Sequence, residues 1–496
     1  MQGRREFLKW FATFMGSLSL GWAGEVFAAR PVAMPRSVGA PRLKLRTSSD
    51  LDALYDGLDL FWGDIHGHTA YSDGYGTPDE YYYNARYMQK LDFTAVTDHA
   101  EWMDRYARNF PMENGAPIPF WDLSIEAADR NCVDGGFTTL PAYEWTSTMY
   151  GHRSVYFRDT ANIPSKPFGT DDYPTPDNLW DALSGYPAIT ISHHPMREMI
   201  PTDWSYYNQM ERLVEIYSKW GNSEDPRTID EQYLYLRASP EKKGKAEGHS
   251  VNDMLRLGYR IGIIAGSDSH QGLAGSIRMD KFRGIPVKDN RDAALSSRDY
   301  SSEIIVSADI TGEEFLEYVG QGYRYDYREP KGGGGGLTGL WAAGLRRDMI
   351  WDRMFARTTY ATTGPRVELR FAVRDSMARA GAIMGGELVV AGNPVVILSA
   401  KAEAGSHIHE VIFMKNGEPI ARFIEDKPEV ELEFEDKGFL KGRTAYYQAR
   451  VVIRQEVGGN TDGDKVLKQY GSKNKFYESD DPMFKEITWT SPVWVD

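Results

Sequence analysis

The sequence is poor in cysteine, in long apolar runs and in basic charge, and each shortage excludes a class of protein. Cys132 is the only cysteine among 496 residues, so no intramolecular disulfide can form. The apolar segment from Trp10 to Ala23 has about 14 residues, short of the roughly 20 that span a bilayer. The formal net charge of −14 argues against nucleic acid as a partner, because phosphate backbones are bound by clustered lysine and arginine. A small anionic substrate is not excluded.

The first 28 residues have the features of an export signal. Arg4 and Arg5 precede a Phe-Leu-Lys sequence, an apolar core and small residues near Ala28. The paired arginines resemble a twin-arginine signal, so we expect residues 1–28 to engage the twin-arginine export machinery and the mature chain to be periplasmic or otherwise exported. After cleavage, no stable membrane span is expected. The alternative is a basic amphipathic or uncleaved anchor.

Five apolar, strand-like runs each end in residues that bind metals. Continuous runs of Val, Ile, Ala and Thr are typical of strands buried on both faces, as in parallel sheets and barrels. In barrels of alternating strands and helices, the functional residues lie at the carboxyl ends of the strands. We therefore expect one multinuclear metal site where these ends converge. The residues concerned are His66 and His68, Asp98 and His99, Glu144, His193 and His194, and Asp268 and His270.

The chain is expected to contain two domains after the signal. A linker over residues 29–54 leads into an α/β domain over 55–360, where strand-like and helical segments alternate. A polar segment at about 276–336 is predicted to be an insertion within it. From 361 to 496, short alternating strands with turn signals such as an Asn-Gly pair predict an antiparallel β-sandwich.

Helices are expected where start signals precede apolar periodicity. The clearest runs from Pro78 to Lys90, with Thr77 as N-cap and proline at the first helical position. Further helices are predicted over residues 177–184, 250–257 and 345–357.

The spacing of His66 and His68 favours metal binding. On an extended segment, residues two apart point to the same face, so both rings can hold one ion or two adjacent ions. Gly67 between them leaves room for a close neighbour, and Asp73 in the following turn can reach back to a metal. Any one histidine is as often a core or surface residue as a ligand. Several acids and imidazoles at one barrel mouth, however, need counter-charges that divalent metals supply.

The motifs "DIHGHTAYSDG", "TDH", "HHP" and "GSDSH", together with Glu144, resemble the series of the PHP (polymerase and histidinol phosphatase) superfamily. Longer strings such as "LFWGDIHGHT", "YATTGPR" and "WTSPVWV" resemble a bacterial subgroup that carries a domain of unknown function. The resemblance covers roughly residues 58–496. It implies a distorted (β/α)7 barrel with up to three metal ions, in proteins that often hydrolyse phosphate esters.

Carried over by position, the resemblance implies a set of metal ligands. His194 fits the motif better than His193, which is expected to be a ligand or a neighbour of one. Asp98 is expected to orient His99, and Glu215 is either a weaker ligand candidate or an interior carboxylate. His407 and His409, which have no acidic or cysteine partners nearby in sequence, are expected to be ordinary histidines. The implied ligands are His66, His68, Asp73, His99, Glu144, His152, His193, His194, Asp268 and His270.

The expected function is that of an exported phosphoesterase with two to three Zn, Mn or Fe ions. A metal-bound hydroxide would attack the phosphate ester, with Asp73, Asp268 and His270 as catalytic residues. The arginines expected to bind phosphate are Arg153, Arg197 and Arg366. Two alternatives stay open: a metallohydrolase that cleaves another bond, of amidohydrolase-like or sulfatase type, and a non-catalytic periplasmic binding protein.

Overall fold

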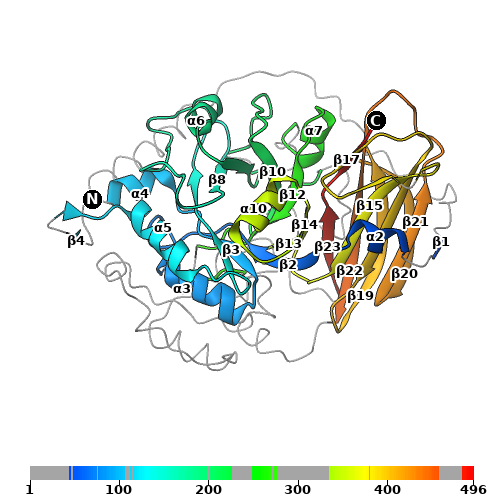
Figure 1. Cartoon of the computed structure of the whole chain (residues 1–496), viewed down its shortest axis with the longest axis horizontal. Helices are drawn as coiled ribbons and strands as arrows, with labels where there is room; N and C mark the ends of the chain where they lie inside the picture. Colours follow the sequence, from blue (N-terminus) through cyan, green and yellow to red (C-terminus); the bar gives the residue numbers. More distant parts are fainter. Residues whose placement is uncertain are drawn as a thin grey trace, which may run out of the picture. The chain divides into compact units, whose positions relative to one another are not determined.

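The computed structural model describes most of the chain after residue 43 (Figure 1). Contact clustering separates Met1–Ala40 from a compact unit over Pro41–Asp496, and the description concerns the second. The expected signal, most of the linker and nearly all of the polar insertion lie outside the described residues. None of the helices in the described part is long and apolar enough to cross a membrane. The described ranges are 44–45, 49–74, 76–106, 112–113, 116–197, 200–225, 248–270, 272–275, 335–378, 380–456 and 483–496.

The metal-binding motifs lie at the ends of strands in two sheets. In the first sheet, β2 (Asp59–Asp64), β3 (Phe93–Ala95) and β6 (Thr138–Leu140) pair in parallel. The second sheet has the order β11-β10-β9-β8-β7, with β12 on β10. Its strands are β7 (Ala142–Trp145), β8 (Arg153–Phe157), β9 (Ala188–Ser192), β10 (Glu211–Ser218), β11 (Gly221–Asn222) and β12 (Gly262–Ala265).

The second sheet is only partly parallel, which departs from the expected regular alternation. β10 is parallel to β9 and β12, but β8 is antiparallel to both β7 and β9. The reason is the short connection from β7 to β8, which contains no helix, and parallel neighbours need a crossover of a dozen or more residues. The apolar runs are nevertheless buried on both faces, as β9 shows with all five residues buried.

Two isolated parallel bridges join these sheets at their carboxyl ends. One pairs Gly67 with Ser269 and the other pairs His99 with Glu144. Gly67 is required at its position because a Cβ there would collide with the ring and hydroxyl of Tyr81. The close neighbour expected from the His-Gly-His sequence is therefore this tyrosine.

The helices start where the sequence signals predict. Thr77 caps α3 (Pro78–Tyr83) in a capping box with Glu80, and the helix continues as η1 (Asn84–Met88). α6 (Pro176–Leu183), α7 (Val251–Arg256) and α10 (Arg347–Phe355) match the other three expected helices. Three helices were not anticipated: α2 (Ser49–Leu54), α4 (Ala100–Tyr106) and α5 (Phe120–Asn131).

The C-terminal region consists of antiparallel strands in two sheets that share one cluster of buried apolar side chains. One sheet has the order β1-β21-β18-β15-β16. Its strands are β1 (Lys44–Leu45), β15 (Glu368–Asp375), β16 (Gly381–Ile383), β18 (Pro394–Lys401) and β21 (Glu429–Glu435). The other sheet contains β17 (Glu387–Leu388), β19 (Ser406–Lys415), β20 (Glu418–Lys427), β22 (Ala445–Glu456), β23 (Met483–Thr490) and β24 (Val493–Val495). Asn416 and Gly417 form the β19–β20 turn with φ of 54° and 79°, as a type I′ turn requires.

The second of these sheets is continuous with the first metal-site sheet. β13 (Leu337–Ala342) pairs with β2 on one side and with β14 (Thr359–Thr362) on the other, and β14 pairs with β23 (Figure 1). The expected boundary between residues 360 and 361 falls within β14. The division into two domains stays a prediction, since hydrogen-bonded strands run across it. A separate two-stranded pair, β4 (Met112–Glu113) and β5 (Ala116–Pro117), completes the described strands.

Candidate metal centre

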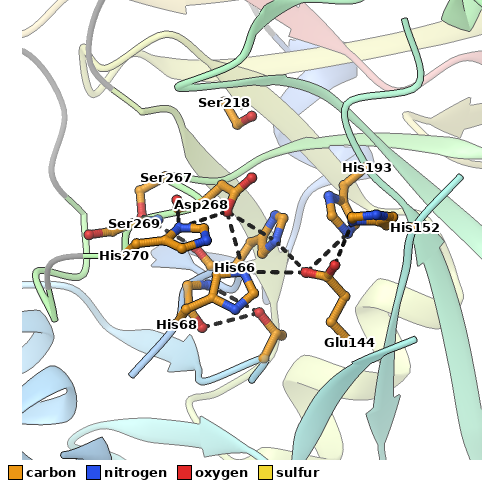
Figure 2. A network of polar contacts seen from close by, with 12 residues as sticks. His66, His68, Glu144, His152, His193, Ser218, Ser267, Asp268, Ser269 and His270 are labelled. Carbon is orange, nitrogen blue, oxygen red and sulfur yellow. Dashed lines mark hydrogen bonds and ion pairs between the residues drawn. The ribbon is translucent and has the colours of Figure 1, made fainter. Parts of the chain in front are cut away.

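The polar residues at the strand ends converge into one cluster (Figure 2). His66 and His68 follow β2, His99 follows β3, Glu144 lies in β7 and His152 precedes β8. His193 and His194 follow β9, while Asp268 and His270 follow β12. His194 and Asp268 adopt positive φ of 36° and 51°, backbone strain of the kind that clusters at functional sites.

Glu144 is the centre of the cluster. Its Oε2 lies 3.3 Å from the Nε2 atoms of three imidazoles, those of His66, His68 and His193. Its Oε1 lies 3.2 Å from His99 Nδ1 and 2.7 Å from His152 Nδ1. One fully buried carboxylate thus faces five imidazoles, an arrangement suited to bridging neighbouring cations.

Asp268 and Asp73 extend the cluster toward His270. Asp268 Oδ1 lies 3.3 Å from His68 Nε2 and 3.5 Å from His270 Nδ1. Asp73 Oδ1 lies 3.4 Å from His99 Nε2, and its Oδ2 lies 3.3 Å from His270 Nε2. Four groups of side chains have ligand atoms close enough together to hold an ion. They are His68/Asp73/His99/His270, His152/His193/His194, His66/His193/Glu215 and His66/His68/Asp268.

The electrostatics of the cluster keep its carboxylates ionised. Burial acts to raise the pKa of Glu144, but the neighbouring imidazoles, His99 first among them, hold it well below its usual value. The pKa of Asp268 is also held well below its usual value, against burial, by His66 and Lys219. Burial lowers the pKa of His193 to about 3, so this ring is neutral at pH 7. Ionised carboxylates and neutral imidazoles are the protonation states that bind metals.

Several buried ligand atoms have no hydrogen-bond partner among the described residues. They include both ring nitrogens of His193, Nδ1 of His68, Nδ1 of His194 and Oδ1 of Asp268. Each unsatisfied buried polar group costs about 1–3 kcal/mol. Divalent cations bound by these atoms would offset that cost. Imidazole and carboxylate donors without thiolate suit Zn, Mn or Fe, so the residues fit the expected cofactor.

Two carboxylates beside the cluster position other residues. Glu215 Oε2 lies 2.7 Å from Nδ1 of His66, which leaves Nε2 of that ring facing Glu144. This is the usual way in which a carboxylate orients a ligating histidine. Asp98 does not orient His99, contrary to expectation. Its oxygens accept hydrogen bonds from the backbone and hydroxyl of Thr69 and from the hydroxyl of Ser72, while His99 Nδ1 lies 2.6 Å from Thr146 Oγ1.

Two of the three arginines expected to bind phosphate are committed elsewhere. Arg153 is fully buried, and its Nε donates to Glu211 at 3.0 Å, so it does not serve an incoming anion. Arg366 donates to the carbonyl oxygens of Gln89 and Lys90, at the C-terminal end of η1.

The third arginine lies beside the cluster. The Arg197 guanidinium carbon lies 3.5 Å from the ring centroid of Trp220, and Trp220 Nε1 donates to Asp268. The same turn supplies a residue that the sequence reasoning missed, Lys219, whose Nζ lies 2.7 Å from His270 Nδ1. Its signal was its position directly after a strand-like run. Only metal ligands were sought there.

The histidines of the C-terminal strands lie apart from the four ligand groups. His407 and His409 are on β19, and His409 Nδ1 lies 2.8 Å from Asp426 Oδ1 at the surface.

A family model described as "Protein of unknown function (DUF3604)" matches residues 109–196 and 219–382, just over half of the chain. An uncharacterised protein of Chlamydia pneumoniae is 22% identical over 448 residues, 88% of this chain. The chain spans only 57% of that relative's length.

Two solved structures also match. A two-domain protein of Bacteroides vulgatus, titled as containing a predicted PHP-like metal-dependent phosphoesterase, is 13% identical with a TM-score of 0.37, and the match covers 84% of this chain and 95% of that one. PsfC of Pseudomonas syringae is 15% identical with a TM-score of 0.26, over 43% of this chain and 77% of that one. At these values, the likeness establishes no shared activity. The expected likeness to PHP proteins and to a domain of unknown function is confirmed by these titles and by the family model.

Proposed function

The chain belongs to the DUF3604 family of proteins of unknown function, and we propose that it is an exported metal-dependent phosphoesterase. The observation that carries the proposal is Glu144, whose two oxygens lie within 2.7–3.3 Å of five imidazoles from four strand ends. We further propose that β2, β3, β6–β7, β8, β9, β10 and β12 close into the distorted seven-stranded barrel. The two isolated bridges between the sheets support that closure.

The chain's own residues suit the hydrolysis of a phosphate ester. Bound divalent ions would supply an acidified water and would neutralise charge on phosphoryl oxygens. His66, His68, Glu144 and Asp268 form the buried part of the ligand set, and Glu215 fixes the ring of His66. Because these side chains are almost fully buried, they define the floor of the site rather than its entrance.

The open side of the cluster is at Asp73. The Asp73 side chain is 31% exposed, whereas those of Glu144 and Asp268 are 1% and 3% exposed. His99 and His270, beside Asp73, are also partly exposed. We therefore assign this side to substrate entry, with the Asp73–His270 pair placed to deliver a proton to the leaving oxygen. In the same proposal, export depends on the twin-arginine signal in residues 1–28.

Metal content and a substrate panel together test the proposal. Protein purified without chelator should contain two to three equivalents of Zn, Mn or Fe by elemental analysis and should hydrolyse aryl phosphates. Glu144→Gln should lose both properties, while His409→Ala, a histidine change on β19, should keep them. Metal-loaded protein that cleaves only sulfate esters or amides would support the non-phosphate hydrolase. Wild-type protein that cannot be loaded would favour the non-catalytic binding protein.

A further inference from the structure

The turn between β10 and β11 places Lys219 and Trp220 at the edge of the metal cluster. Tyr217 pairs with Asn222 and Ser218 pairs with Gly221, so Lys219 and Trp220 are the two loop residues of a tight hairpin. Gly221 has a φ of 97°, which a residue with a side chain rarely adopts. The backbone N–H of Lys219 also donates to the carbonyl oxygen of Ser267, one residue before Asp268. The backbone therefore fixes both side chains relative to the site.

Two cations share the ring of Trp220. The Arg197 guanidinium carbon lies 3.5 Å from the ring centroid, and Lys219 Nζ lies 5.0 Å from it. Cations over an indole face are attracted by its quadrupole. Because Trp220 Nε1 donates to Asp268, the ring itself is attached to a member of the ligand set. Arg197, the indole and Lys219 thus form one rigid edge beside the metal cluster.

The charge balance of a loaded site gives this edge a purpose. The cluster has four carboxylates, those of Asp73, Glu144, Glu215 and Asp268, and two divalent ions would balance them. Lys219 and Arg197 then add two positive charges. Lys219 is only 8% exposed, and a buried charge is costly unless an opposite charge meets it. A substrate that carries two negative charges supplies the match.

We propose that Lys219 and Arg197, held on Trp220, form a clamp for the phosphoryl group of a phosphate monoester. The proposal rests on the proposed function and deepens it by naming the class of ester. A monoester presents three unsubstituted oxygens and a charge near −2, whereas a diester presents two and a charge of −1. The planar guanidinium donates to two oxygens and the ammonium binds a third, so the clamp favours the monoester.

Calorimetric titration with two small anions tests the clamp without turnover. Inorganic phosphate represents the monoester end and dimethyl phosphate the diester. Metal-loaded wild-type protein should bind phosphate more tightly than dimethyl phosphate. Lys219→Met and Arg197→Met should each weaken phosphate binding by roughly 10-fold or more, the loss expected for one charged hydrogen bond. Lys219→Arg should retain most of the affinity because it keeps the charge.

Controls separate the clamp from folding and from the metal site. Lys166→Met removes an exposed lysine that is paired with Asp172, so it should leave phosphate affinity unchanged. Elemental analysis should show wild-type metal content in every variant compared. Phosphate affinity unchanged in both clamp variants would refute the clamp, and equal losses for both anions would refute the preference for monoesters. Wild-type protein without metal would refute the proposed function; titration of that protein with phosphate would still decide the clamp, since its two cations belong to the chain.

Discussion

A buried ion pair ties the Lys219–Trp220 hairpin to the C-terminal strands, and its removal should measurably destabilise the protein. Glu224 follows β11, and both its carboxylate oxygens lie 3.1 Å from Nη1 of Arg450 on β22. Trp489 on β23 donates to the same carboxylate at 2.9 Å. Glu224 is 1% exposed and Arg450 is 6% exposed, so water cannot replace either partner.

The expected cost of Arg450→Met follows from that burial. Removal of one partner of a buried ion pair leaves an uncompensated charge and costs about 3–5 kcal/mol. At about 2.1 cal/mol/K per residue, the unfolding entropy of a chain this long is about 1 kcal/mol/K. The melting temperature should therefore fall by about 3–5 °C in calorimetry. Phosphate affinity should fall as well, because the hairpin that carries the clamp loses its attachment.

A control on the same strand makes this prediction sharp. Arg454 is also on β22 and lies 3.2 Å from Asp426, but its side chain is 28% exposed. Arg454→Met should therefore cost no more than about 1 kcal/mol. The double variant Glu224→Gln/Arg450→Met should recover part of the loss, because no buried charge is left unpaired. Equal shifts for Arg450→Met and Arg454→Met would refute the reasoning.

Three further predictions concern the metal site and acid stability. Asp98→Asn should weaken metal affinity about 10- to 100-fold, measured by competition with a chromogenic chelator, because Asp98 holds the loop at Thr69 rather than a metal; unchanged affinity would contradict this role. Chelation should lower the melting temperature and added metal should restore it, since a ligand that binds only the folded state stabilises it. Burial acts to raise the pKa of Asp436, but hydrogen bonds from Lys415 and Tyr447 bring it below its usual value. Its stabilising effect is thus complete above the unfolded pKa of about 3.9 and is lost as pH falls through the folded value. Urea denaturation of Lys415→Met should show a smaller loss of stability below about pH 4 than wild type shows, and an equal loss would count against the pairing.

The sequence predicted the residues of the candidate site better than their roles. His66, His68 and Glu144 could be found because each follows or lies within an apolar strand, and strand ends of this kind meet at one edge. Arg153 could not be placed, because its partner Glu211 is 58 residues away and only the pairing of β8, β9 and β10 brings them together. A buried arginine with an acidic partner and an arginine that awaits an anion look the same in a sequence.

The pairing of β8 was beyond the sequence for a related reason. Its residues are buried on both faces, as in a parallel strand, so composition did not distinguish the two directions. What decides the direction is the connection after β7, which is too short for a crossover helix. Helix α5 was missed because its first turn has no side-chain cap after Pro119, although Phe120, Leu123 and Ala127 form a buried stripe at helical spacing.

The residues of the candidate site also join the sheets that carry them, through backbone rather than side-chain atoms. The N–H of Glu144 donates to the carbonyl oxygen of Asp98 at 3.0 Å, and the N–H of Asp268 donates to that of His66 at 2.9 Å. A change such as Glu144→Gln removes a charge from the cluster but keeps these backbone bonds. Because closure and metal binding use different atoms of the same residues, loss of metal can be separated from loss of fold. That separation is what allows ligand substitutions to test the function of this protein rather than its folding.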